Sequence, residues 1–77
     1  MKDEALLRKL DDYLNFFEFI AYLWKRKELT GQEVRAVFDY SLGTIAGDAA
    51  VLEYIRQNQW GYEGLRELLD RMGYTDR

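Results

Sequence analysis

The stretch Leu14-Asn15-Phe16-Phe17-Glu18-Phe19-Ile20-Ala21-Tyr22-Leu23-Trp24 is the most aromatic part of the 77-residue sequence, and Glu18 is its only charged residue. From Phe16 to Trp24 most sides of a helix would be apolar. We therefore expect a long first helix, over residues 3–27, whose second half is covered by other helices, by a partner or by a ligand. The helical spacing of three and four residues is carried by Leu7, Leu10, Leu14, Phe17, Ala21 and Trp24.

A second helix is predicted directly after a short link. Thr30-Gly31-Gln32-Glu33 has the pattern of a capping box, in which the threonine hydroxyl accepts a backbone N–H and the glutamate reaches back to the cap. The helix that follows is expected over residues 31–42. Gly43 can end it, or Gly47 can if the helix continues through the small residues between them.

Two more helices complete the chain. Asp48 can cap a third helix over residues 49–58, whose last residue suits a left-handed helix end. A turn is expected at residues 59–61. The fourth helix is expected over residues 62–72, with Gly73 just beyond its end. The fold class predicted from these elements is all-α, a compact bundle of four helices with a long aromatic first helix.

Length and composition indicate a single helical domain, residues 1–77. A chain of this size buries only about 60% of its unfolded surface, so it commonly needs disulfides, a metal or association for stability. The sequence has no cysteine and no histidine, which removes disulfides, thiol nucleophiles and the usual zinc and acid–base residues. We therefore expect no cofactor, no metal site and no enzymatic activity. Association remains as the means of stabilisation.

Charge bears on the class of partner. The chain has a net charge of −3, and Lys25-Arg26-Lys27 is its one basic run, placed where cations favour a helix C-terminus. Nucleic-acid binding through this run and Arg35 is the weakest option, because such proteins usually have a basic face. The aromatic stretch is shorter than the ~20 apolar residues of a membrane span, and acidic residues follow Met1-Lys2 at once. We expect a cytoplasmic protein that contacts neither membrane nor nucleic acid.

The exposed parts of the aromatic helix are the leading candidate site. Large amphipathic rings are enriched at protein interfaces and among the residues that dominate their binding energy. The sequence therefore predicts a non-catalytic protein-interaction or oligomerisation module that forms a homodimer or binds another protein. The residues expected to make the contact are Phe16, Phe19, Tyr22, Leu23 and Trp24.

The alternative is a small-ligand-binding sensor domain. The same aromatic residues are typical of ligand pockets, which combine an apolar lining with a few polar groups. In this hypothesis Asn15 and Glu18, three residues apart on one helix, orient the ligand as a polar handle. The pocket would be lined by Tyr40, Tyr54 and Trp60, with Phe17 and Tyr22.

Glu18 also has an interpretation that concerns the fold alone. It lies between Phe17 and Phe19, so partial burial is expected, and a buried carboxylate needs a hydrogen-bonding or cationic partner. We expect it at the edge of the helix, in solvent or paired with Arg35 or Arg56.

The segment Leu14-Asn15-Phe16-Phe17-Glu18-x-x-Ala21 resembles a bacterial family of uncharacterised small helical proteins. The resemblance continues at Leu29-Thr30-Gly31-Gln32-Glu33-Val34 and, less closely, at Leu52-Glu53-Tyr54-Ile55-Arg56, and it covers most of residues 6–72. It differs at Gly43-Thr44-Ile45-Ala46-Gly47, where the family often has bulkier aromatic residues, and many members of the family have a membrane helix upstream of the matching region. The resemblance implies a shared helical fold and a shared pair, Asn15 and Glu18, and it implies no activity.

Overall fold

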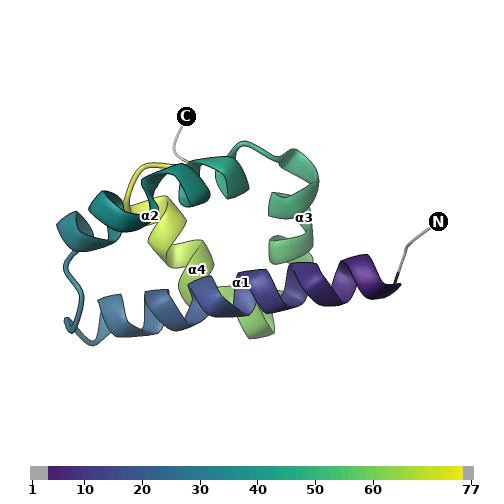
Figure 1. Cartoon of the computed structure of the whole chain (residues 1–77), viewed down its shortest axis with the longest axis horizontal. Coiled ribbons are helices and arrows are strands. Elements are labelled where there is room, and N and C mark those ends of the chain that lie inside the picture. The colour runs from purple at the N-terminus through teal and green to yellow at the C-terminus, as the bar shows by residue number, and fades with distance from the viewer. Residues whose placement is uncertain (1–3, 76–77) are drawn as a thin grey trace.

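The computed structural model describes residues 4–75, which form four helices and no strand within that range. The helices are α1 (Glu4–Lys25), α2 (Gly31–Ala46), α3 (Ala49–Gln57) and α4 (Gln59–Arg71). Figure 1 shows α1 along one edge and α2 along the opposite edge, with α3 running from the end of α2 back towards α1 and α4 behind them. The compact all-α bundle with a long first helix is thus confirmed. Asp3, the expected first residue of α1, lies outside the described residues.

The core lies mainly between α1 and α4, which pack against each other far more extensively than α1 packs against α2. Leu14, Phe17 and Ala21 are fully or almost fully buried, as the helical spacing predicts. Burial of apolar side chains is the main favourable term in folding. The other core residues are Ile20, Val34, Leu42, Ile45, Ala46, Ile55, Tyr62, Leu65, Leu68 and Leu69.

α1 ends at Lys25, two residues earlier than expected, because the chain turns in the left-handed conformation at Lys27. Lys27 has a φ of 65°, and the backbone N–H of Glu28 donates to the carbonyl of Leu23 at 2.9 Å. This is the usual way to satisfy the last carbonyls of a helix, although glycine is the residue most often found there. The sharp turn places α2 close to the end of α1.

α2 begins with the predicted capping box. The Glu33 N–H donates to Thr30 Oγ1 at 3.0 Å, and the Thr30 N–H donates to Glu33 Oε1 at 2.9 Å. The helix continues past Gly43 to Ala46 and ends at Gly47, so the shorter of the two expected ends is wrong. A glycine inside a helix costs about 1 kcal/mol, and burial of Ile45 and the neighbouring residues outweighs it.

The junction of α3 and α4 differs from the prediction. Asp48 caps α3 as expected, since its Oδ1 accepts the N–H groups of Ala50 and Val51. Asn58 is not left-handed, with a φ of −114°, and residues 59–61 form the first turn of α4. The helix then kinks at Tyr62, whose φ and ψ are −129° and 24°. Gly73 has the expected positive φ, 83°, after the end of α4.

Candidate functional site

Glu18 caps the second part of α4. Its Oε1 accepts the Leu65 N–H at 2.7 Å, and its Oε2 accepts the Gly64 N–H at 3.1 Å. The kink at Tyr62 frees these N–H groups, because a helix that restarts leaves its first donors without intrahelical partners. Glu18 thus supplies from α1 the carboxylate that an N-cap residue would supply locally.

This arrangement replaces the partners expected for Glu18. Neither arginine pairs with it, because Arg35 donates to the Met72 carbonyl and Arg56 pairs with Glu53. The half-buried carboxylate also depends on Gly64, since a Cβ there would lie 2.7 Å from Oε2. Glu18 therefore has a structural role in the junction of α1 with α4.

A second carboxylate, Asp11, joins three helices. The hydroxyls of Tyr54 and Tyr62 both donate to Asp11 Oδ1, each at 2.6 Å. These two hydrogen bonds hold the pKa of the Asp11 carboxyl below its usual range. Burial is the largest cause that raises the pKa of the Tyr62 hydroxyl, and the hydrogen bond to Asp11 is the next largest. The hydroxyl therefore remains a donor at neutral pH. The sequence had given Asp11 no role, because the two tyrosines lie more than 40 positions away.

We expect Asp11 to make stability depend on pH in acid. A carboxyl whose pKa is lowered by folding stabilises the protein above its unfolded pKa, here near the ordinary 3.8, and that contribution is lost as the pH falls through the lower folded pKa. Urea unfolding of wild type and Asp11→Asn between about pH 2 and pH 6 checks this. The difference in stability between them should shrink as the pH falls below about 4. A constant difference would show that the ionised carboxylate contributes nothing.

An open cleft of about 330 Å³ lies beside Asp11. Its lining brings together Asn15, Tyr54 and Trp60, three of the seven residues predicted for the ligand site. Glu18 is bound to the α4 backbone instead, and Tyr40 lies on α2 with its side chain 86% exposed and outside the cleft. The rest of the lining was not predicted and consists of Asp11, Asn58, Gly61 and Tyr62.

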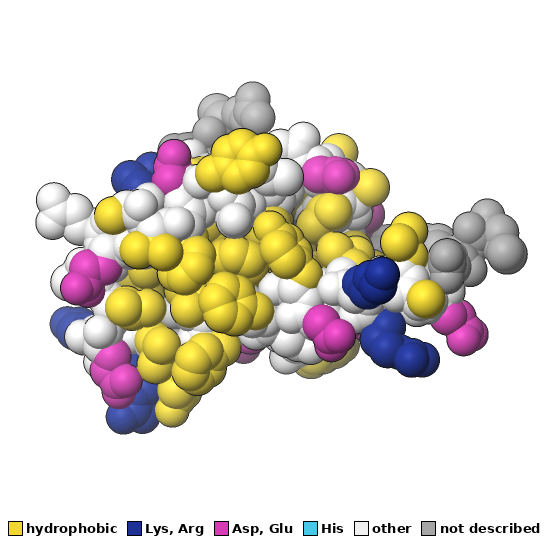
Figure 2. Space-filling model, in the orientation of Figure 1, with side chains coloured by type: hydrophobic (Ala, Val, Ile, Leu, Met, Phe, Trp, Pro, Cys, Tyr) yellow, Lys and Arg dark blue, Asp and Glu magenta, His cyan; other side chains and the backbone are white. Residues whose placement is uncertain are grey.

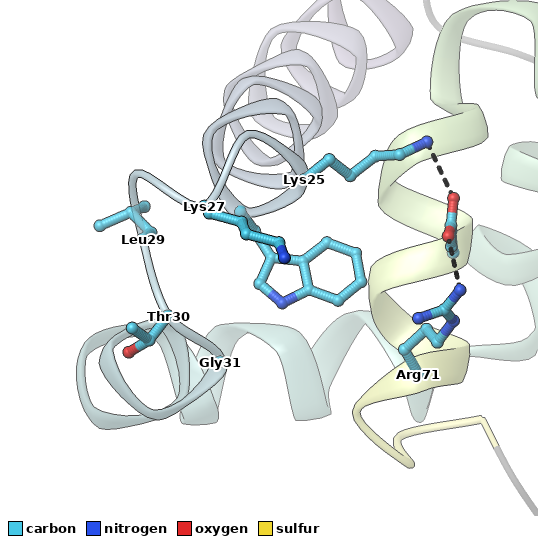
Figure 3. A pocket seen from close by; sticks show the side chains of 8 residues that line it. Lys25, Lys27, Leu29, Thr30, Gly31 and Arg71 are labelled. Atoms are coloured by element: carbon cyan, nitrogen blue, oxygen red, sulfur yellow. Dashed lines mark ion pairs between the residues drawn. The ribbon is translucent and has the colours of Figure 1, made fainter.

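A larger pocket of about 460 Å³ lies where α1 ends and α2 begins. Figure 3 shows Lys25 of α1 and Arg71 of α4 directed at one carboxylate, that of Glu67. The hydrogen bond from Lys25 holds the pKa of Glu67 below its usual value. Glu67 therefore pairs with two of the three cations that line the pocket, Lys25 and Arg71, whereas the third, Lys27, is not its partner. Trp24, predicted as an interface residue, is half-buried and lines this pocket.

An apolar surface crosses from α1 to α2. Figure 2 shows hydrophobic side chains that continue from one helix to the other, with charged side chains around the edge. We define the α1–α2 face as Phe16, Phe19 and Leu23 of α1 with Val37 and Phe38 of α2. Phe16, Phe19 and Val37 are 48%, 53% and 71% exposed. The ring centroids of Phe16 and Phe38 are 5.8 Å apart, and the two rings meet edge to face. The two helices are therefore in contact within the α1–α2 face.

The predicted interface residues are therefore divided among different surroundings. Phe16, Phe19 and Leu23 belong to the α1–α2 face. Tyr22 is exposed beside Phe19, with a ring separation of 6.4 Å, and Arg26 donates to its hydroxyl. Val37, which sequence reasoning missed, is the most exposed member of the face. The helical spacing of Val34, Val37 and Leu42 favours an inward side chain at Val37, and its exposure shows that this expectation is wrong.

The basic residues considered for nucleic-acid binding mostly have acidic partners. Lys25 pairs with Glu67, and Arg26 pairs with Glu28 at 2.9 Å. Arg35 lies 3.7 Å from Asp39. Within residues 4–75, no helix is long and apolar enough to cross a membrane, and no group of three acidic side chains is placed to hold a metal ion.

No family model, curated protein or solved structure matches the chain. The resemblance to the bacterial helical family stays a prediction. The geometry of the α1–α2 face and of the cleft beside Asp11 is the basis for the proposals that follow.

Proposed function

We propose that this protein is a non-catalytic association module that forms a homodimer through the α1–α2 face. The observation that carries the proposal is the hydrophobic surface that continues from α1 to α2 in Figure 2, together with the exposure of Phe16, Phe19 and Val37 and the contact of Phe16 with Phe38. Soluble monomers rarely expose contiguous apolar patches larger than roughly a few hundred Å², and such patches mark interaction sites. Aromatic side chains, which form most of this face, are enriched in interfaces.

A second copy of the chain is the occupant that the charge distribution favours. In a two-fold dimer the same patch lies on both subunits, so every charge in it would face a like charge near the axis. Figure 2 shows charged side chains at the edge of the hydrophobic surface and not within it, although the chain carries a net charge of −3. Two such faces can therefore meet without electrostatic repulsion. Association would also add the buried apolar area that a small single-domain core lacks.

The affinity is expected to be modest. Stable dimers usually bury about 800 Å² on each partner, and smaller interfaces form transient complexes. A face of five side chains is at the small end of this range, so we expect dissociation constants of roughly 1–100 μM. Sedimentation velocity from about 1 μM to about 1 mM would then show a concentration-dependent rise from monomer to dimer. A strict monomer across that range would overturn the proposal.

Two variants test whether the α1–α2 face makes the contact. Phe19→Glu and Val37→Glu place a carboxylate in it at exposed positions, and each should weaken dimerisation by more than about tenfold. The matched control is Leu6→Glu, because Leu6 is also exposed on α1 but lies about 20 Å along the helix from Phe19. A dimer that survives both variants, or that is lost equally in the control, would contradict the assignment of this face.

A further inference from the structure

The cleft beside Asp11 has the chemistry of a cation site, and it lies outside the α1–α2 face. Asp11 is the only formal charge among the residues that line it, which include no lysine or arginine. Both tyrosine hydroxyls donate to Oδ1 of this carboxylate. Within residues 4–75, no hydrogen bond or ion pair engages Oδ2. One oxygen is thus held by the fold, and the other is available to a ligand.

Three aromatic side chains share the lining of the cleft with this carboxylate. Trp60 is 91% exposed at the cleft, and the fold makes little use of so large a side chain. The rings of Tyr54 and Tyr62 lie 6.3 Å apart and tilted by 43° within the same lining. Aromatic faces attract cations, and indole is the strongest of them. Trp60 and Asp11 therefore favour the same sign of charge.

The amide groups of the lining complete an acceptor-rich site. Asn58 Nδ2 donates to the Tyr54 carbonyl at 2.7 Å, which leaves Asn58 Oδ1 as an acceptor. Asn15 adds a second amide from α1. Within residues 4–75, no group of three acidic side chains is placed to hold a metal ion, and the cleft has one carboxylate. An organic cation needs only one carboxylate and a surface of aromatic carbon.

We propose that this cleft binds an organic ammonium group, with the positive charge between the Asp11 carboxylate and the Trp60 indole. The group belongs to a small free amine or to the side chain of a lysine in a peptide, with the nitrogen fully methylated in either case, since the two share this chemistry. The site is independent of dimerisation, because none of its residues lies in the α1–α2 face.

The test uses choline as the probe and its uncharged isostere, 3,3-dimethylbutan-1-ol, as the matched ligand control. Binding to the full chain is followed by NMR through the indole N–H signals of Trp60 and Trp24, which separate the cleft from the other tryptophan. We expect saturable shifts at Trp60 with choline and at least about tenfold weaker binding of the alcohol. Equal binding of the two compounds, or no saturable binding of choline, would overturn the proposal.

Two variants and a second ligand sharpen the result. Trp60→Leu and Asp11→Asn should each weaken choline binding by about tenfold or more, whereas Tyr40→Leu, at an exposed ring outside the cleft, should not. Trp60→Leu is informative even if Asp11→Asn disturbs the tyrosines, because the Trp60 side chain is exposed. Binding unchanged in both cleft variants would contradict the site. A peptide with one trimethyllysine between glycines distinguishes the sources: tighter binding than choline indicates a peptide, and weaker binding a free amine.

Discussion

Replacing Glu18 by alanine should lower the free energy of unfolding by about 2–3 kcal/mol. Glu18 accepts two backbone N–H groups at the kink of α4, at 2.7 and 3.1 Å. Hydrogen bonds to charged groups contribute about 1.5–3 kcal/mol each, and a lost helix cap costs about 1 kcal/mol. Gly64 and Leu65 are buried, so water cannot fully replace the carboxylate at their N–H groups. Urea unfolding followed by circular dichroism measures the loss.

The Glu18→Gln variant is the matched control for charge. The amide keeps one acceptor oxygen but loses the second acceptor and the favourable interaction with the helix N-terminus. We expect it to cost about half as much as the alanine variant. If Glu18→Ala changed stability by less than about 0.5 kcal/mol, the cap would have no energetic role.

Gly64 gives a double-mutant cycle for the same contact. In the wild type, Gly64→Ala should be destabilising. The alanine Cβ would lie 2.7 Å from Oε2 of Glu18, so the carboxylate would have to move. In the Glu18→Ala background the remaining neighbour is the Ala21 Cβ at 3.4 Å, an ordinary contact. Alanine is favoured over glycine in a helix by about 1 kcal/mol. The effect of Gly64→Ala should therefore change sign between the two backgrounds. Additive effects would contradict the close approach of these two residues.

The comparison of Glu18 with its predicted partners shows what a sequence leaves open. Burial of Phe17 and the need of Glu18 for a partner followed from helical spacing and from the cost of burying a charge. The partner itself was a pair of backbone N–H groups freed by a kink at Tyr62. A kink depends on tertiary packing and has no proline to mark it. Side-chain partners such as arginines are visible in a sequence, whereas exposed backbone donors are not.

Tertiary packing also explains why the α1–α2 face and the cleft beside Asp11 were only partly predicted from the sequence. Local signals decided the capping box at Thr30 and the cap at Asp48, because these contacts span two or three residues. Asp11 meets Tyr54 and Tyr62 only through the packing of three helices. Of the residues predicted to bind a ligand, the cleft brings together Asn15, Tyr54 and Trp60, whereas Tyr40 lies outside it. α1 and α2 make only a small contact. The extent of that contact decides which of their apolar side chains stay exposed, and helical spacing alone does not give it.

The other large effect is expected for the core. Leu65→Ala should lower the free energy of unfolding by about 3 kcal/mol, within the usual range of 2–5 kcal/mol for a buried leucine. The Leu65 side chain is fully buried within the core that α1 and α4 share. Total stability for a chain of this size is roughly 4–12 kcal/mol, so this single change removes a large share of it. Chemical unfolding at one fixed protein concentration measures the loss, since association would add to stability.

Leu6→Ala is the matched control, because Leu6 is 65% exposed and its truncation should change stability by no more than about 0.5 kcal/mol. The Leu65 variant also separates packing from capping. Alanine at position 65 keeps the backbone N–H that donates to Glu18, so Glu18→Ala should still cost at least about 1 kcal/mol in that background. If the cost vanished there, Glu18 would act by supporting the Leu65 side chain and not by capping the helix. A loss below about 1 kcal/mol for Leu65→Ala itself would contradict a well-packed interface between α1 and α4.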